Sequence, residues 1–392
     1  MGYLKRVGPK RYRHAYEGPK IDGERKQLTG TFYDLTKTEA EAKLAKLEAK
    51  VRDGQHVRNP NLTFSQLFND FMEKKKPPAL AVSTYERYEI YGRHYILPRF
   101  GEKKVADIRQ GDLVDAYAEW RAKGGRNKPV SGRTVHHVHD LMRCVLNFGV
   151  RRDLVARNVA ALVPAEDLPR APKPEPKALD EEEIKRLLEA AREPSSRSSK
   201  RSYLSAEPWF APAVAFSIYT GARRGEVVAL KWSDLNLNAK SVTIRRSLAE
   251  TKTAGRFFKE PKNGKARTIA LPAPLVATLE RHRKRQDQER KALGSGYKDD
   301  DLVFARPDGS FAKPWNYASA VRDLARRAKV KPITLHDLRD THASLLAKNG
   351  VPLEVVSKRL GHSSVGVTAE RYLHVYSDRD AAAASVLDTL GC

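Results

Sequence analysis

The chain has 392 residues, of which 40% are hydrophobic and 31% are charged, enough to fill the cores of two or three domains and leave solvated surfaces. Its 73 basic residues outnumber 48 acidic ones, and this net charge of +25 favours a polyanionic partner, because neutralising backbone phosphates releases their counterions. Two cysteines cannot build a disulfide framework or a zinc site, and no apolar stretch reaches the length of a membrane span or a signal-peptide core.

Residues 1–58 are predicted to form a small sheet covered by one helix. Bulky and basic side chains alternate over residues 11–16, and residues 27–33 make a second strand-like run. The Thr36–Glu39 capping box opens a helix over Lys37–Arg52. A sheet with lysine and arginine on one face could enter a DNA groove, although a solvated accessory sheet explains the same residues almost as well.

Residues 62–162 are predicted to be entirely helical. Helices are expected over residues 64–75, 83–97, 110–122 and 131–150, and a Thr63-x-x-Gln66 capping box opens the first of them. Basic side chains on the expected surfaces and loops could grip phosphates, but a run of charge is more often a solvated face. These basic residues are Arg87, Arg93, Lys103, Lys104, Arg126, Lys128 and Arg133.

Residues 163–178 are predicted to be an extended linker, because five prolines between positions 164 and 176 forbid helix and sheet. A mixed α/β region follows over residues 179–392, with a tight turn at Asn263-Gly264 and helical patterns after Pro274. Its small antiparallel sheet is expected from residues 241–247, 256–259 and 266–271. The predicted fold class is therefore multidomain and mainly α with α+β: a small sheet-plus-helix domain, an all-helical domain and a mixed α/β domain.

Five short motifs follow one another in the second half of the chain. They are Thr220-Gly221-Ala222-Arg223-Arg224-Gly225-Glu226, Pro261-Lys262-Asn263-Gly264-Lys265, His336-Asp337-Leu338-Arg339, Leu360-Gly361-His362-Ser363 and Arg371-Tyr372-Leu373-His374. In this order they supply fixed cations, imidazoles and one phenol. Attack on a phosphodiester adds negative charge to it, which arginine is suited to stabilise because it stays charged and grips two oxygens at once.

Each motif alone is weak. Arg223 follows a glycine that can end one helix and itself opens the next, where exposed amides favour an anion. His336 and Arg339 are three residues apart in a helical stretch and so lie on one face. A capping histidine, a surface arginine and a packing tyrosine would explain the same residues singly, so the argument depends on the complete set.

The complete set, in this order, resembles the tyrosine recombinase (phage integrase) family. The match covers about residues 175–392. The regions 1–58 and 62–162 resemble, more loosely, the arm-type and core-type DNA-binding domains of that family. The resemblance implies a site-specific recombinase of a phage or integrative element, which integrates or excises the element through a 3′-phosphotyrosyl intermediate.

The resemblance also implies which residues act on the phosphate. Arg223 and Arg339 would bind it and stabilise the pentacovalent transition state. His362 would hydrogen-bond it, and His336 would assist proton transfer at the tyrosine. Glu226 would orient its neighbours.

The resemblance makes Tyr372 the nucleophile and Lys262 the acid that protonates the leaving 5′ oxygen. Tyr372 stands ten residues after the Leu-Gly-His motif, which favours it over Tyr376. For the lysine, Lys259 and Lys265 remain alternatives because they are close by. An unperturbed phenol has a pKa of about 10, so the nucleophile needs a cationic pocket or a base.

The partners implied are double-stranded DNA, at core and arm attachment sites, and further copies of this chain. Exchange of four strands takes four tyrosines, so a DNA-bound homo-tetramer is expected, with an excisionase or a DNA-bending protein as an accessory partner. An apolar stripe over residues 381–390 would dock on a neighbouring copy or pack on its own domain. No cofactor or metal is expected, and we expect a cytoplasmic, nucleoid-associated protein with no membrane partner.

Two other functions share parts of this pattern. A type IB topoisomerase-like enzyme would use the same chemistry to relax one duplex rather than exchange strands between two. A catalytically silent DNA-binding regulator would need only the basic surface, so the complete set of six site residues disfavours it.

Overall fold

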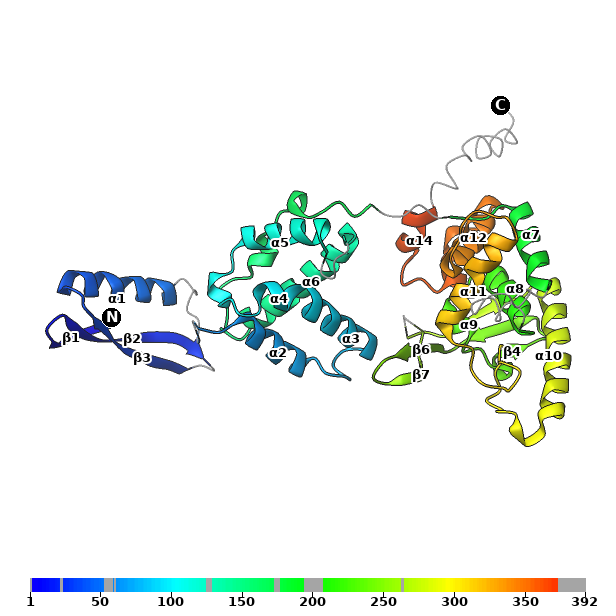
Figure 1. Cartoon of the computed structure of the whole chain (residues 1–392), viewed down its shortest axis with the longest axis horizontal. Coiled ribbons are helices and arrows are strands. Elements are labelled where there is room, and N and C mark those ends of the chain that lie inside the picture. The colour runs from blue at the N-terminus through cyan, green and yellow to red at the C-terminus, as the bar shows by residue number, and fades with distance from the viewer. Residues whose placement is uncertain are drawn as a thin grey trace, which may run out of the picture. The chain divides into compact units, whose positions relative to one another are not determined.

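The computed structural model describes residues 2–21, 24–52, 59, 61–124, 129–172, 177–193, 207–261 and 264–372 (Figure 1). The chain divides into two compact units, residues 1–173 and 174–392. Helices predominate and the sheets are small and antiparallel, which confirms the predicted fold class. Within the described ranges, no helix is long and apolar enough to span a bilayer. Residues 173–176 of the predicted linker lie outside them.

The first unit begins with a three-stranded antiparallel sheet in the order β1 (Tyr3–Gly8), β2 (Arg11–Ile21), β3 (Glu24–Tyr33). Helix α1 (Lys37–Arg52) covers one face of it, and the predicted Thr36–Glu39 capping box is formed. The small core between them consists of Tyr12, Tyr16, Phe32, Ala40 and Leu44. The sequence did not predict β1, because this edge strand is largely exposed and lacks an alternating apolar pattern.

The rest of the first unit is helical, as predicted. Its helices are α2 (Phe64–Lys74), α3 (Val82–Tyr91), α4 (Leu97–Phe100), α5 (Gln110–Ala122) and α6 (Gly132–Val150). A π turn over Gly92–Ile96 joins α3 to α4, and the Leu97 amide donates to the Gly92 carbonyl. Pro98 follows directly and has no amide hydrogen for a regular helical bond, so the predicted 83–97 helix continues in this wider form.

The second unit is built around α8 (Phe210–Thr220), which contacts α7 (Glu181–Arg192), α10 (Ala273–Leu293) and α12 (Leu335–Lys348). The buried side chains of α8, among them Phe210 and Phe216, form the middle of the core. The remaining helices are α9 (Arg224–Val227), α11 (Pro314–Arg327), α13 (Leu353–Leu360) and α14 (Val365–Tyr372). Arg339, near the start of α12, donates to the carbonyls of Gly221 and Leu360, so the C-terminal ends of α8 and α13 meet there. These three helix ends carry three of the five motifs.

The strands described in the second unit form two sheets, where one was expected. The first contains β4 (Leu235–Asn236), β5 (Ser241–Ile244) and β8 (Arg267–Ala270), and the second is a hairpin of β6 (Ser247–Thr251) and β7 (Gly255–Lys259). The predicted 241–247 strand breaks because Arg245 and Arg246 turn towards the buried carboxylate of Asp234, at 3.7 and 2.5 Å. Between β7 and β8 the Gly264 amide donates to the Pro261 carbonyl at 2.8 Å. Asn263, the other residue of the predicted tight turn, lies outside the described residues.

Candidate active site

Arg223 is placed by a sharp turn at the end of α8. Gly221 has a φ of +63°, and a Cβ there would lie 2.7 Å from Leu360 Cδ2, so this position requires glycine. The chain then extends through Arg223, whose amide donates to Glu226 Oε2 at 2.8 Å. The Arg223 guanidinium donates to Glu226 Oε1 and to the Gly361 carbonyl, each at 3.1 Å. The side chain keeps 27% of its surface exposed, so its charge can still meet a ligand.

Arg339, on α12, is almost completely buried, with 2% of its surface exposed. Its Nη1 donates to the Gly221 carbonyl at 2.7 Å and its Nη2 to the Leu360 carbonyl at 2.5 Å. Burial and the charge of Arg223 lower the pKa of Arg339 to about 9, which still leaves it a cation at neutral pH. Arg339 therefore ties together the turns that carry two other predicted site residues, Arg223 and His362.

His362 follows a second left-handed glycine, Gly361, with a φ of +64°. Its Nδ1 pairs with the Thr368 hydroxyl at 2.7 Å, which leaves Nε2 for a ligand. Burial, and then the charges of Arg339 and Arg223, lower the pKa of His362 to about 4. The ring is thus a neutral hydrogen-bonding group at neutral pH.

Arg223 and His362 border a cavity of about 800 Å³, and Arg339 lies behind its lining. Four cations line it: Arg223, Lys265, Arg267 and Lys358. His362 and Ser363 add polar groups, and among the described residues no carboxylate belongs to the lining. A cavity with this charge suits a phosphate group rather than a cation or an apolar ligand.

Tyr372 is not part of that lining. It ends α14 with only 1% of its surface exposed, and its hydroxyl donates to Asp340 Oδ1 at 2.5 Å. The other oxygen of Asp340 accepts from Arg371 Nη2 at 2.6 Å. Burial and the hydrogen bond to Asp340 both raise the pKa of Tyr372 above its ordinary value. The phenol is therefore held protonated and turned into the protein, beside Ala343, Val356 and Leu360.

His336 lies in the first turn of α12 and is exposed. Protein packed around its ring desolvates the charged form and lowers the pKa of His336; Asp340 opposes this effect, while Arg371 and Arg339 reinforce it. Its position one helical turn before Asp340 places it on the same side of α12 as the partner of Tyr372.

Lys262 lies outside the described residues, and so do Tyr376 and the apolar stripe of residues 381–390. Pro261 and Lys265, which lie on either side of Lys262 in the sequence, both line the cavity. The sequence analysis did not single out Arg267 or Asp340 as site residues. Asp340 directly follows the His-x-x-Arg motif, a signal that could have been used, whereas Arg267 belongs to no motif.

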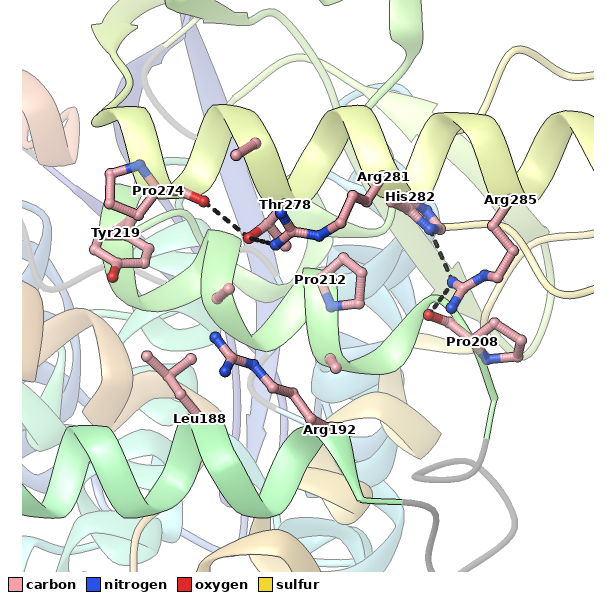
Figure 2. Close-up of a pocket in the computed structure, with 13 residues that line it drawn as sticks. Leu188, Arg192, Pro208, Pro212, Tyr219, Pro274, Thr278, Arg281, His282 and Arg285 are labelled. Atoms are coloured by element: carbon pink, nitrogen blue, oxygen red, sulfur yellow. Dashed lines mark hydrogen bonds between the residues drawn. The ribbon is translucent and has the colours of Figure 1, made fainter.

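A second hollow lies between α7, α8 and α10, where Arg192, Arg281 and Arg285 reach a groove edged by prolines (Figure 2). Arg285 donates there to the Pro208 carbonyl and pairs with His282. None of the predicted site residues that the structure describes lines this groove. Across the same described ranges, no group of three histidine, cysteine or carboxylate side chains could hold a metal ion.

The sequence of this chain matches two family models and is similar to those of known proteins. The model of the phage integrase family matches residues 177–379, and that of the phage integrase N-terminal SAM-like domain matches residues 63–121. A XerC-like tyrosine recombinase of Caldanaerobacter subterraneus subsp. tengcongensis is 27% identical over 389 residues, 94% of each chain. An integrase of Streptomyces ambofaciens is 28% identical, over 86% of this chain and 82% of its own.

Solved structures share the fold. The Tn1549 transposon integrase, in complex with a circular intermediate DNA, aligns with a TM-score of 0.68 at 17% identity over 83% of this chain and 99% of its own. A lambda integrase tetramer bound to a Holliday junction aligns with a TM-score of 0.55 at 15% identity over 96% and 97%. Since the family model spans more than half of the sequence, and residues of three motifs line one cationic cavity, the chain belongs to the phage integrase family of tyrosine recombinases.

Proposed function

We propose that this chain is the site-specific recombinase of a phage or integrative element, and that it cuts and rejoins DNA through a 3′-phosphotyrosyl intermediate. The observation that carries the proposal is the cavity where Arg223, Arg267 and His362 meet, because it gathers positive charge from distant parts of the sequence. Cutting and rejoining DNA is the reaction of this family, and the cavity offers a binding site for the scissile phosphate.

The proposed reaction is an in-line exchange of esters. Arg223 and Arg339 hold the non-bridging oxygens and neutralise the charge that accumulates, and His362 donates a hydrogen bond from Nε2. The Tyr372 oxygen attacks phosphorus as its proton passes to the neutral imidazole of His336. The bond to the 5′ oxygen breaks as Lys262 supplies a proton to it. The phosphotyrosine keeps the energy of the original ester, so rejoining needs no nucleotide.

The inward position of Tyr372 implies a step before chemistry. Its hydroxyl has to leave Asp340 and reach the cavity, so we propose that binding of a correct site shifts α14 from a resting to an attacking arrangement. A resting protein of this kind binds DNA before it can cut it.

We propose four parts for the chain: an arm-type DNA reader over 1–58, a core-type DNA-binding domain over 62–162, a linker over 163–178 and the catalytic domain over 179–392. The sheet supports the first assignment. In the strand register Lys5 stands opposite Arg13, and Arg13 opposite Thr31. This row points away from the side that packs on α1, since the buried Tyr12 and Phe32 alternate with it.

The active assembly is proposed to be a tetramer on two DNA duplexes, with each copy supplying one Tyr372. The lambda integrase tetramer on a Holliday junction, which shares the fold, supports this arrangement. The apolar residues 381–390 would join neighbouring copies, and an excisionase or DNA-bending protein would set the direction of the reaction.

Substitution of the two candidate tyrosines tests the proposal. Tyr372→Phe should bind a nicked suicide substrate but form no covalent adduct, and Tyr376→Phe, the matched control, should still form it. An adduct that persists in Tyr372→Phe and is lost in Tyr376→Phe would overturn the assignment. Absence of any adduct with the unaltered protein would reject the function itself.

A further inference from the structure

Arg267, the first residue of β8, lines the cavity but performs no step of the reaction proposed above, and its side chain joins two motif regions. Its Nη2 and Nη1 meet Glu226 Oε2 and Oε1 at 2.6 and 3.1 Å, a two-pronged ion pair. Its Nε donates to the Arg359 carbonyl, near the end of α13, at 2.9 Å. Only 8% of the side chain is exposed, so these contacts are made inside the protein.

Glu226 lies between two arginines. Its side chain is 1% exposed, and it accepts from the amide of Arg223 and from Arg223 Nη1 as well as from Arg267. Burial alone would raise the pKa of Glu226, but Arg267, followed by Arg223, lowers it below its ordinary value. The carboxylate is thus a buried negative charge that must be paired.

The pairing of the Glu226 carboxylate with both arginines determines which atoms of Arg223 remain for a ligand. Arg267 occupies both oxygens of Glu226, so Arg223 contributes one guanidinium nitrogen to Glu226 at 3.1 Å. Nη2 of Arg223 donates to the Gly361 carbonyl, and the side chain borders the cavity. Without Arg267, Arg223 would be the one cation among the described residues that still hydrogen-bonds to Glu226. A two-pronged pair between them would be favoured and would draw the guanidinium away from the phosphate.

We propose that Arg267 is a positioning residue of the reaction: by neutralising Glu226, it leaves Arg223 free to bind the scissile phosphate. This inference rests on the proposed function.

Its position in the chain adds a second consequence. Arg267 begins β8, and its Cδ lies so close to Gly361 that a Cβ there would be 2.9 Å away. The same side chain therefore packs against the glycine that precedes His362.

The first test uses the full chain and separates binding from chemistry. Affinity for a core-site duplex is measured at equilibrium, and the rate constant of adduct formation is measured in single turnover on a nicked suicide substrate. Arg267→Gln should leave affinity close to that of the unaltered protein and lower the rate constant by about 100-fold, the usual effect of a small displacement in a reacting group. Arg326→Gln, which removes an exposed cation from α11, is the matched control and should alter neither quantity.

The second test asks whether Arg267 acts through Glu226. Glu226→Gln removes the buried charge, so adding Arg267→Gln to it should cost little more. We expect the double variant to react at least about tenfold faster than the product of the two single effects predicts. Effects that simply multiply would overturn the proposal, as would an Arg267→Gln variant with unaltered rate or one whose whole defect is lost affinity.

An Arg267→Gln variant that does not fold still leaves a test. If Arg267→Gln alone is unstable because it strands the Glu226 charge, the double variant lacks that charge and is compared with Glu226→Gln. Arg267→Lys keeps a cation but not the two-pronged pair, and should lose about tenfold in rate with DNA affinity retained. Full activity of Arg267→Lys together with a large further loss in the double variant would reject the proposal. An unaltered protein that forms no adduct would instead reject the proposed function.

Discussion

Replacing Asp340 with asparagine should release the nucleophile. The carboxylate accepts from the Tyr372 hydroxyl at 2.5 Å and from Arg371 at 2.6 Å, and asparagine keeps its shape while removing its charge. A hydrogen bond to a charged group contributes about 1.5–3 kcal/mol and a neutral one about 1 kcal/mol. The difference of about 0.5–2 kcal/mol corresponds to a roughly 2–30-fold shift towards the outward position of the tyrosine.

The assay is the single-turnover rate of covalent adduct formation on a nicked duplex with one core site, at saturating protein. We expect Asp340→Asn to react about tenfold faster at neutral pH, within the range set by that shift. Because the carboxylate raises the pKa of Tyr372, its loss should also move the rise of rate with pH towards lower pH. Asp287→Asn, in an exposed pair with Arg290, is the matched control and should change neither result.

A slower reaction by Asp340→Asn, with DNA affinity unaltered, would refute this reasoning. It would mean that Asp340 assists the attack, for example by accepting the phenolic proton, rather than restraining the tyrosine. An unchanged rate would show that leaving Asp340 is not a significant part of the barrier.

Four further outcomes are expected. Cleavage and rejoining should persist in excess EDTA without ATP, since arginines supply the positive charge; strict dependence on added magnesium would contradict the mechanism. A chain starting at Asn61 should keep weak cleavage at core sites but lose integrative recombination. Binding of arm-site DNA by the removed part should weaken steeply with salt. Normal recombination by the shortened chain would contradict arm binding. Deletion after Ser377 should preserve site binding but weaken tetramer formation, as measured by light scattering of DNA complexes; unchanged tetramers would reject that role. Burial lowers the pKa of His282 to about 4 and of His342 to about 3, so both stay neutral in the fold while the unfolded chain takes up protons below about pH 6.5. The free energy of unfolding, measured with urea, should therefore be lower at about pH 5 than at pH 7 by about 2 kcal/mol for each histidine. An unchanged unfolding midpoint between these two pH values would contradict this.

Local signals in the sequence predicted local structure well. The capping boxes at Thr36 and Thr63 are formed as expected, because each depends on residues three positions apart. The edge strand β1 was missed because it is largely exposed and lacks an alternating apolar pattern. The break between β5 and β6 was missed because it depends on the buried Asp234, 12 positions before Arg246.

The same distinction applies to the site. The motifs marked Arg223, Arg339 and His362, which the structure gathers around one cavity and its adjoining turns. Two pairings within the site had no signal in the sequence. Arg267 meets a carboxylate 41 positions earlier, and Tyr372 one 32 positions earlier, so only the folded chain brings them together.

The buried phenol of Tyr372 also bears on the safety of the host genome. A protein with a net charge of +25 spends much of its time on DNA of arbitrary sequence, where its arginines meet phosphates everywhere. An exposed nucleophile would then break strands at random, and the free energy needed to withdraw Tyr372 from Asp340 acts as a threshold against it. Only sites whose extra binding energy exceeds this threshold would be cut, so a single buried hydrogen bond would help convert a modest preference in binding into a much sharper preference in cleavage.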